Sequence, residues 1–146
     1  SIDDVKKNWE KLKIKEKKKG ILSGVPNHLP SLIKAHRVQD KVASVGFDFP
    51  NVKNTIDKIK EEFEEFNAAV LSQNKSEIED EFGDILFSLI NYSRHIGIDS
   101  NGSLKKSTQK FIDRFNKIEK ILKTKNLDFD NCSVEELNNF WNEVKK

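Results

Sequence analysis

The stretch KEEFEEFNAAVLSQNKSEIEDEFGDILF, residues 60–87, carries nine carboxylates within a repeat of apolar residues. Apolar residues recur at three- and four-residue steps on both sides of SQNKS (residues 72–76), which is the pattern of two amphipathic helices. The second helix is expected to open with a capping box of Ser76 and Glu79. Because the connection is short, we expect the two helices to form an antiparallel hairpin.

The helical period continues over the rest of the chain, and Gly- and Pro-containing turns separate its segments. Pro30 is well placed as the first residue of a helix, and Ser133 with Glu136 forms a second capping box. No strand pattern and no linker is evident, so we expect one all-α domain over residues 1–146, built as an antiparallel helical bundle. Helices are expected at about residues 2–18, 30–45, 52–72, 76–96, 104–122 and 133–145, with a turn at residues 99–102.

Composition limits the class of protein. Charged residues make up 34% of the 146 residues, yet the net charge is only +2, which argues against a polyanion-binding protein overall. Basic charge is uneven, since residues 1–20 hold eight lysines against four acids. The single cysteine, Cys132, cannot form an internal disulfide, which favours a reducing, cytoplasmic compartment. Apolar runs fall short of the roughly 20 residues of a membrane span, so no membrane partner is expected.

Helical geometry sorts the acids by face. At about 100° per residue, a polar stripe on the helix at 76–96 has apolar residues on both sides. On the preceding helix, Glu62 lies at the edge of the apolar face and Glu65 lies one turn further on. In a hairpin these two can face Glu81 and Asp84, which are an i, i+3 pair. The stripe comprises Glu77, Glu81, Asp84, Ser88, Asn91 and His95, and the main apolar side comprises Ile78, Phe82, Ile85, Leu89 and Ile96, with Phe87 and Ile90 beyond the stripe.

Four converging carboxylates need compensation. Two unit charges roughly 4 Å apart repel by about 4 kcal/mol at an effective dielectric constant of about 20. Several such pairs are large against a domain stability of about 5–15 kcal/mol. A hard cation would relieve this repulsion, and an all-oxygen ligand set suits Mg²⁺ or Mn²⁺. The alternative is a solvated acidic face, and the spacing alone leaves both readings open.

A phosphate ligand also needs basic groups, and two pairs at i, i+4 spacing offer them. Lys110 and Arg114 flank the apolar stripe of the fifth expected helix, and Trp141 and Lys145 lie on the last one. Each pair has a structural alternative, because basic side chains bordering a core extend to solvent and a late tryptophan packs. His28, His36 and His95 are expected to be structural or surface residues.

The acidic motifs resemble a known signature. EEFEE (residues 61–65) followed by EFGD (residues 81–84) resembles the EExxE…ExxD pattern of the all-α nucleoside triphosphate pyrophosphohydrolases. The similarity extends to the C-terminal catalytic domain of the MazG family over nearly the whole chain. The segments that carry it are HLPSLIKAHRVQDKVASVGFDF (28–49), EFGDILFSLINYSRHIG (81–97), KFIDRF (110–115) and FWNEVK (140–145).

The resemblance implies an enzyme that converts a nucleoside triphosphate to the monophosphate and pyrophosphate, for housecleaning of the nucleotide pool. It implies a Mg²⁺ cofactor, with Mn²⁺ as a substitute, and a homodimer that completes the helical bundle. By position it assigns metal binding to Glu62, Glu65, Glu81 and Asp84, a supporting catalytic role to Glu61, neutralisation of the phosphates to Lys110 and Arg114, and nucleotide binding to Trp141 and Lys145.

One position departs from the family that the chain resembles. The connection between the two acidic motifs is shorter, and Glu77 stands where that family has a lysine before the ExxD motif. The alternatives to an enzyme are a non-catalytic helical dimerisation domain and a nucleic-acid-binding module that uses the basic first helix. The nearly neutral net charge and the acidic stripe argue against binding to nucleic acid.

Overall fold

The computed structural model spans residues 1–146 and describes the side chains of residues 1–14 and 19–146. The described residues form α-helices and one 3-10 turn without a β-strand among them, which confirms the predicted all-α class. The chain divides into two compact units, residues 1–100 and 101–146. The single domain over residues 1–146 stays a prediction.

The helices fall close to the expected segments. The Ser133 capping box is present: the Ser133 hydroxyl accepts from the Glu136 amide, and the Glu136 side chain accepts from the Ser133 amide. The turn expected at residues 99–102 is wrong, because a helix already begins at Ser100. The elements are α1 (Ile2–Lys19), α2 (Ser31–Ala43), α3 (Val52–Ser72), α4 (Lys75–His95), α5 (Ser100–Thr124), the 3-10 turn η1 (Phe129–Asn131) and α6 (Val134–Lys145).

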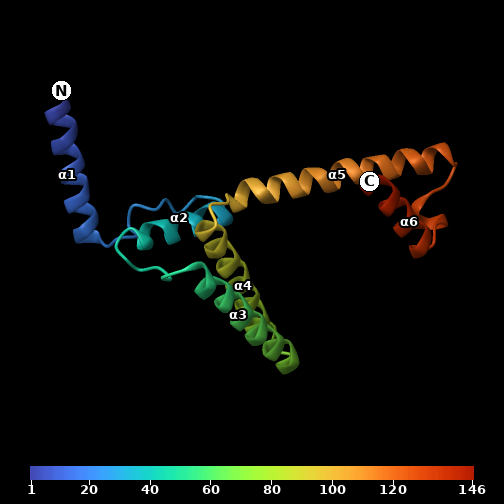
Figure 1. Cartoon of the computed structure of the whole chain (residues 1–146), viewed down its shortest axis with the longest axis horizontal. Coiled ribbons are helices and arrows are strands. Elements are labelled where there is room, and N and C mark those ends of the chain that lie inside the picture. Colours follow the sequence, from blue (N-terminus) through green and yellow to red (C-terminus); the bar gives the residue numbers. More distant parts are fainter. The chain divides into compact units, whose positions relative to one another are not determined.

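Helices α3 and α4 form the expected hairpin and lie side by side in Figure 1. The predicted capping box of Ser76 with Glu79 is wrong. Instead, the side chain of Asn74 accepts hydrogen bonds from the amides of Ser76 and Glu77, so α4 begins at Lys75. Gln73 ends α3 in the left-handed conformation, with φ at 59°. This left-handed residue and the Asn74 cap together complete a tight turn.

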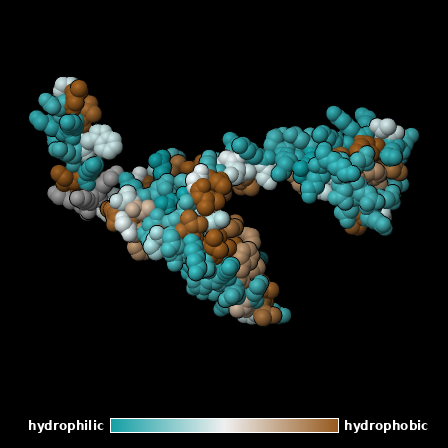
Figure 2. Space-filling model, in the orientation of Figure 1, coloured by the Kyte–Doolittle hydropathy of each residue, from teal (hydrophilic) through white to brown (hydrophobic). Residues whose placement is uncertain are grey.

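The face of α4 that is buried differs from the expected one. Ile85 is buried as predicted, but Phe82, Leu89 and Ile96 are 51%, 41% and 41% exposed. In their place α4 buries Ser88, from the polar stripe, together with Ile90 and Ser93. The opposing side of α3 contributes Thr55, Glu62 and Ala69. The buried residues of α4 therefore include part of the polar stripe, although Phe82 still packs against Phe66 of α3 with ring centroids 5.8 Å apart. Apolar surface remains exposed along the hairpin in Figure 2.

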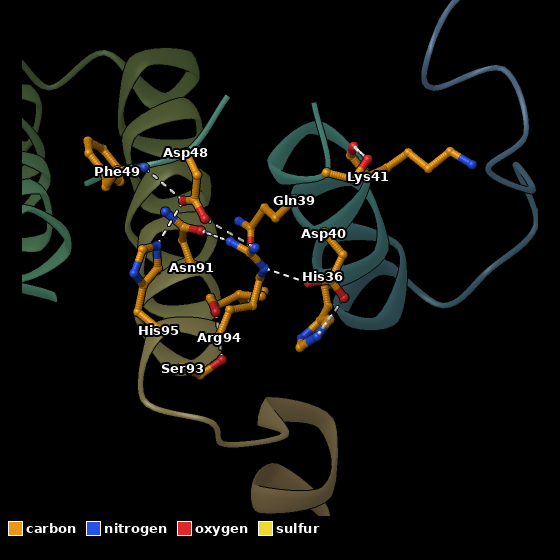
Figure 3. A network of polar contacts seen from close by, with 12 residues as sticks. His36, Gln39, Asp40, Lys41, Asp48, Phe49, Asn91, Ser93, Arg94 and His95 are labelled. Carbon is orange, nitrogen blue, oxygen red and sulfur yellow. Dashed lines mark hydrogen bonds and ion pairs between the residues drawn. The ribbon is translucent and has the colours of Figure 1, made fainter. Parts of the chain in front are cut away.

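Side-chain contacts between residues far apart in the sequence join helix α2 to α4 (Figure 3). The buried side chain of Gln39 donates from Nε2 to the carbonyl of Phe87 at 2.9 Å. Arg94 of α4 donates from Nε to Asp40 at 2.8 Å and from a terminal nitrogen to Asn91 at 2.6 Å. The contacts of Gln39 and Asp40 hold the C-terminal half of α2 against α4, whereas the contact with Asn91 lies within α4.

The connection between α2 and α3 is held by Asp48. Its Oδ1 lies 2.8 Å from Nε2 of His95 and accepts from the Phe49 amide at 2.8 Å, while Oδ2 lies 3.4 Å from Arg94. Burial acts to raise the pKa of Asp48, but the hydrogen bonds from His95, the Phe49 amide and Arg94 outweigh it. The pKa of Asp48 therefore lies below its ordinary value, so ionised Asp48 stabilises this junction.

The second unit is organised around α5. Ile118 and Leu122 are its buried residues, and Phe115 stacks on Phe129 of η1 with ring centroids 5.2 Å apart. Phe111 packs against Trp141 of α6 at 5.3 Å between centroids. None of the helices among the described residues has a segment long and apolar enough to cross a bilayer.

Candidate metal and phosphate sites

Three of the predicted metal ligands converge across the α3–α4 hairpin. Glu62 of α3 and Glu81 and Asp84 of α4 each present a carboxylate oxygen, and these oxygens lie within 4.8 Å of one another. The burial is graded: Glu62 is buried, Glu81 is half-buried and Asp84 is exposed. The cluster therefore opens to solvent on the Asp84 side, and Glu62 forms its interior.

Two carboxylate oxygens of this cluster are buried and lack a hydrogen-bond partner among the described residues. Oε2 of Glu62 and Oε2 of Glu81 are both inaccessible to solvent and have no hydrogen-bond partner among the described residues. A buried charged oxygen without a partner is costly, and such atoms mark positions where an ion or an ordered water is needed. The cluster is therefore more than an acidic surface, because part of its charge is directed inward.

Glu65, the fourth predicted ligand, lies on the exposed surface of α3 near this cluster. The charge of Glu62 is the main cause that raises the pKa of Glu65, and desolvation and the charges of Glu81 and Glu61 act in the same direction. Glu65 therefore shares the electrostatic field of Glu62 and Glu81, although it is not among the three carboxylates that converge within 4.8 Å.

Lys58 is the residue at this site that sequence reasoning missed. Its Nζ lies 2.9 Å from Oε1 of Glu62 and 3.5 Å from Oε2 of Glu61. The hydrogen bond to Glu62 is the main cause of a raised pKa for Lys58. The i, i+3 and i, i+4 spacing to the two glutamates was the signal in the sequence that could have identified it.

The donor set of the cluster suits a hard divalent cation. The three converging side chains are all carboxylates, and two of their oxygens are buried without a described partner. Oxygen ligands of this kind match Mg²⁺ or Mn²⁺ better than the nitrogen and sulfur ligands of zinc sites do. Glu62, Glu81 and Asp84 would hold such an ion, and Glu65 is close enough to share its field.

Within the second unit, basic side chains line an open groove between α5 and α6. The predicted phosphate-binding residues Lys110 and Arg114 lie in it together with Lys145, and Asp113 is an acidic residue in the same lining. Lys106, Lys117 and Lys146 extend the basic surface. The i, i+4 pair on α5 and the C-terminal end of α6 therefore face one groove, which suits an anionic ligand.

Trp141 has a structural role within this unit. Its ring packs on Phe111, and the guanidinium of Arg114 lies over the Trp141 ring at 5.6 Å from its centroid. This cation–π contact orients Arg114 toward the groove while Lys110 and Lys145 stay exposed. The predicted acidic site residues belong to the first unit, and these predicted basic residues belong to the second.

Glu77, which stands where the related family has a lysine, lies in the first turn of α4, next to the connection from α3. Its Oε2 lies 3.1 Å from the hydroxyl of Ser72, and its amide donates to Asn74. The short turn therefore uses Glu77 to tie the start of α4 to the end of α3.

Residues 51–118 match the model of the MazG nucleotide pyrophosphohydrolase domain. The chain is 37% identical over 95% of its length to the nucleoside triphosphate pyrophosphohydrolase/pyrophosphatase MazG of Thermotoga maritima. It is 31% identical over 98% of its length to a nucleoside triphosphate pyrophosphohydrolase of Escherichia coli. The chain spans 54% and 57% of these two relatives, about half the length of each.

Proposed function

Because the chain carries a domain of the MazG nucleotide pyrophosphohydrolase family at residues 51–118, we propose that it hydrolyses nucleoside triphosphates, ribo- or deoxy-, to monophosphates and pyrophosphate. The observation that carries this proposal is the convergence of Glu62, Glu81 and Asp84 with two buried oxygens that have no described partner. The names of the two relatives agree with this reaction.

We assign the metal site to Glu62, Glu65, Glu81 and Asp84. The ion is Mg²⁺, with Mn²⁺ as a substitute, because the donors are carboxylate oxygens. When bound, Mg²⁺ would offset negative charge on the triphosphate and on the departing pyrophosphate. One carboxylate among Glu61, Glu62 and Glu65 orients or deprotonates the attacking water, and its proton transfer assists attack on phosphorus.

The basic residues of the second unit are assigned to the substrate. Lys110 and Arg114 neutralise the phosphate chain, since fixed cations stabilise the charge that develops in phosphoryl transfer. Trp141 and Lys145 help to hold the nucleotide, and Trp141 also supports the guanidinium of Arg114. The groove between α5 and α6 supports this assignment because Lys110, Arg114 and Lys145 line it together.

A homodimer is part of the proposal. Large apolar side chains remain exposed on the hairpin, among them Phe63, Phe82, Leu86, Phe87 and Leu89. A second copy that covered them would bury the surface that the α3–α4 packing leaves open. We further propose a cytoplasmic role in clearing unwanted nucleotides from the pool.

The test is a panel of ordinary, deoxy and modified nucleoside triphosphates, each incubated with Mg²⁺ and scored for all phosphate products. Monophosphate and pyrophosphate in equal amounts are expected, with no release when the metal is chelated. Orthophosphate with diphosphate would contradict the proposed bond cleavage. Absence of any hydrolysis with both Mg²⁺ and Mn²⁺ would favour a binding or dimerisation domain instead.

A further inference from the structure

The carboxylate of Glu62 is divided between two environments. Its Oε1 lies 2.9 Å from Nζ of Lys58, whereas its Oε2 is buried without a described partner. The Glu62 side chain is only 6% exposed, while that of Lys58 is 37% exposed. The lysine therefore reaches from the surface of α3 to a buried charge on the same helix.

A buried carboxylate needs a counter-charge at all times, including when no metal is bound. Removing one partner of a buried ion pair is strongly destabilising, because the remaining charge is left without compensation. Glu61, the second acidic contact of Lys58 at 3.5 Å, is exposed and has water as an alternative partner. Glu62 is thus the carboxylate that depends on Lys58.

We propose that Lys58 is a positioning residue for Glu62. It supplies the counter-charge of the buried carboxylate in the metal-free protein, and by holding Oε1 it leaves the second oxygen to the cluster with Glu81 and Asp84. A divalent cation bound to that cluster then takes over part of the compensation. The last step rests on the proposed function, whereas the role of Lys58 in the metal-free protein does not.

The first measurement is thermal unfolding of the full chain in the presence of a chelator. Lys58→Met keeps an apolar stem of similar length but removes the charge, and it should lower Tm by about 4–8 °C, a value reduced for the partial exposure of the lysine. Lys58→Arg should restore most of the loss because it retains the cation. Lys60→Met, at an exposed lysine of the same helix, is the matched control and should change Tm by no more than about 2 °C. An unchanged Tm for Lys58→Met would overturn the proposal.

A double-mutant cycle shows whether the loss arises from Glu62. Adding Glu62→Gln to Lys58→Met removes the charge that lacks compensation, so the double variant should be more stable than Lys58→Met alone. If both substitutions simply add their losses, Lys58 acts through another contact and the proposed positioning role is wrong.

The third measurement adds Mg²⁺ without nucleotide and follows Tm again. The rise in Tm should be larger for Lys58→Met than for the unaltered chain, since the ion supplies the missing charge, and it should be absent in the double variant. Equal rises in Tm for Lys58→Met and the unaltered chain would contradict the proposal that the cation takes over part of the charge compensation from Lys58. If the unaltered chain shows no rise with Mg²⁺ or Mn²⁺, but Lys58→Met is destabilised and the double variant recovers, the proposed metal site fails while the counter-charge role stands.

Discussion

Nε of Arg94 lies 2.8 Å from Oδ1 of Asp40, a contact that spans 54 positions of the sequence and joins α4 to α2. The Arg94 side chain is only 10% exposed, although Asp40 is half exposed. The same guanidinium reaches Asp48 and Asn91 (Figure 3), so one side chain ties two helices and a connecting segment together. This arrangement sets the position of α2 beside the half of α4 that follows the acidic cluster.

Replacing Arg94 by Gln should destabilise the first unit by about 2 kcal/mol. The estimate lies below the loss for a fully buried ion pair because Asp40 and Asp48 retain access to water. Urea unfolding followed by circular dichroism measures the difference. Arg37→Gln, at an exposed arginine of α2, should stay within about 0.5 kcal/mol of the unaltered chain. Equal effects of the two substitutions would show that the network contributes nothing beyond surface charge.

The lowered pKa of Asp48 should make the stability of the chain depend on pH. Its pKa in the folded chain lies below the ordinary value of 3.8, so its contribution is complete above that value and is lost as the pH falls through the folded pKa. Asp48→Asn should therefore lower Tm at neutral pH, and the gap to the unaltered chain should shrink at acid pH. Thermal unfolding over a pH series measures this gap, with the exposed Asp57→Asn as control. A gap that stays constant down to about pH 2 would rule out ionisation as its cause.

Glu81→Gln should reduce Mg²⁺-dependent pyrophosphate release by at least about 100-fold, since even residues that only support metal ligands cost 10- to 100-fold. Removing one of several like charges should leave the metal-free chain as stable as before or more so. Pyrophosphate release and thermal unfolding in chelator measure the two effects. Glu79→Gln, at an exposed carboxylate two residues away, should retain activity. Full activity of Glu81→Gln would show that the assigned site is wrong.

Gln73→Gly should stabilise the α3–α4 hairpin by about 0.5–1 kcal/mol. Gln73 adopts φ of 59°, in the left-handed region where a side chain is unfavourable and glycine is not. Chemical unfolding measures the gain. The same substitution at Gln109, inside α5, should instead destabilise by about 1 kcal/mol because glycine lowers helix stability. A loss at Gln73 would mean that its side chain makes a stabilising contact that outweighs the backbone strain.

Local sequence patterns predicted the helices correctly but misplaced some of their ends. The Ser133 capping box was predicted because its two hydrogen bonds join residues three apart. The start of α4 was misplaced because Asn74 and Ser76 both qualify as caps, and the geometry of the turn decides between them. The early start of α5 at Ser100 shows likewise that turn-forming residues can begin a helix.

The acidic cluster could be predicted from the sequence because helical spacing sets which residues share a face. Glu81 and Asp84 are related by one turn of α4, and the short connection after α3 places Glu62 opposite them. The contact between Lys58 and Glu62 could have been predicted by the same rule, since Lys58 precedes Glu62 by four residues. Spacing does not indicate depth, however, so the contrast between buried Glu62 and exposed Asp84 required the packed hairpin.

The sequence by itself determined the all-α class, the order of the helices and the spacing of the acids, because each depends on contacts within a few residues. Only the tertiary structure decided which side of α4 is buried, that Arg94 meets Asp40, and that Lys145 of α6 shares a groove with Arg114 of α5. Those outcomes depend on the total free energy of contacts between distant segments. The burial of Ser88 in preference to Phe82 is an example, since the hydrophobicity of single residues predicts the reverse.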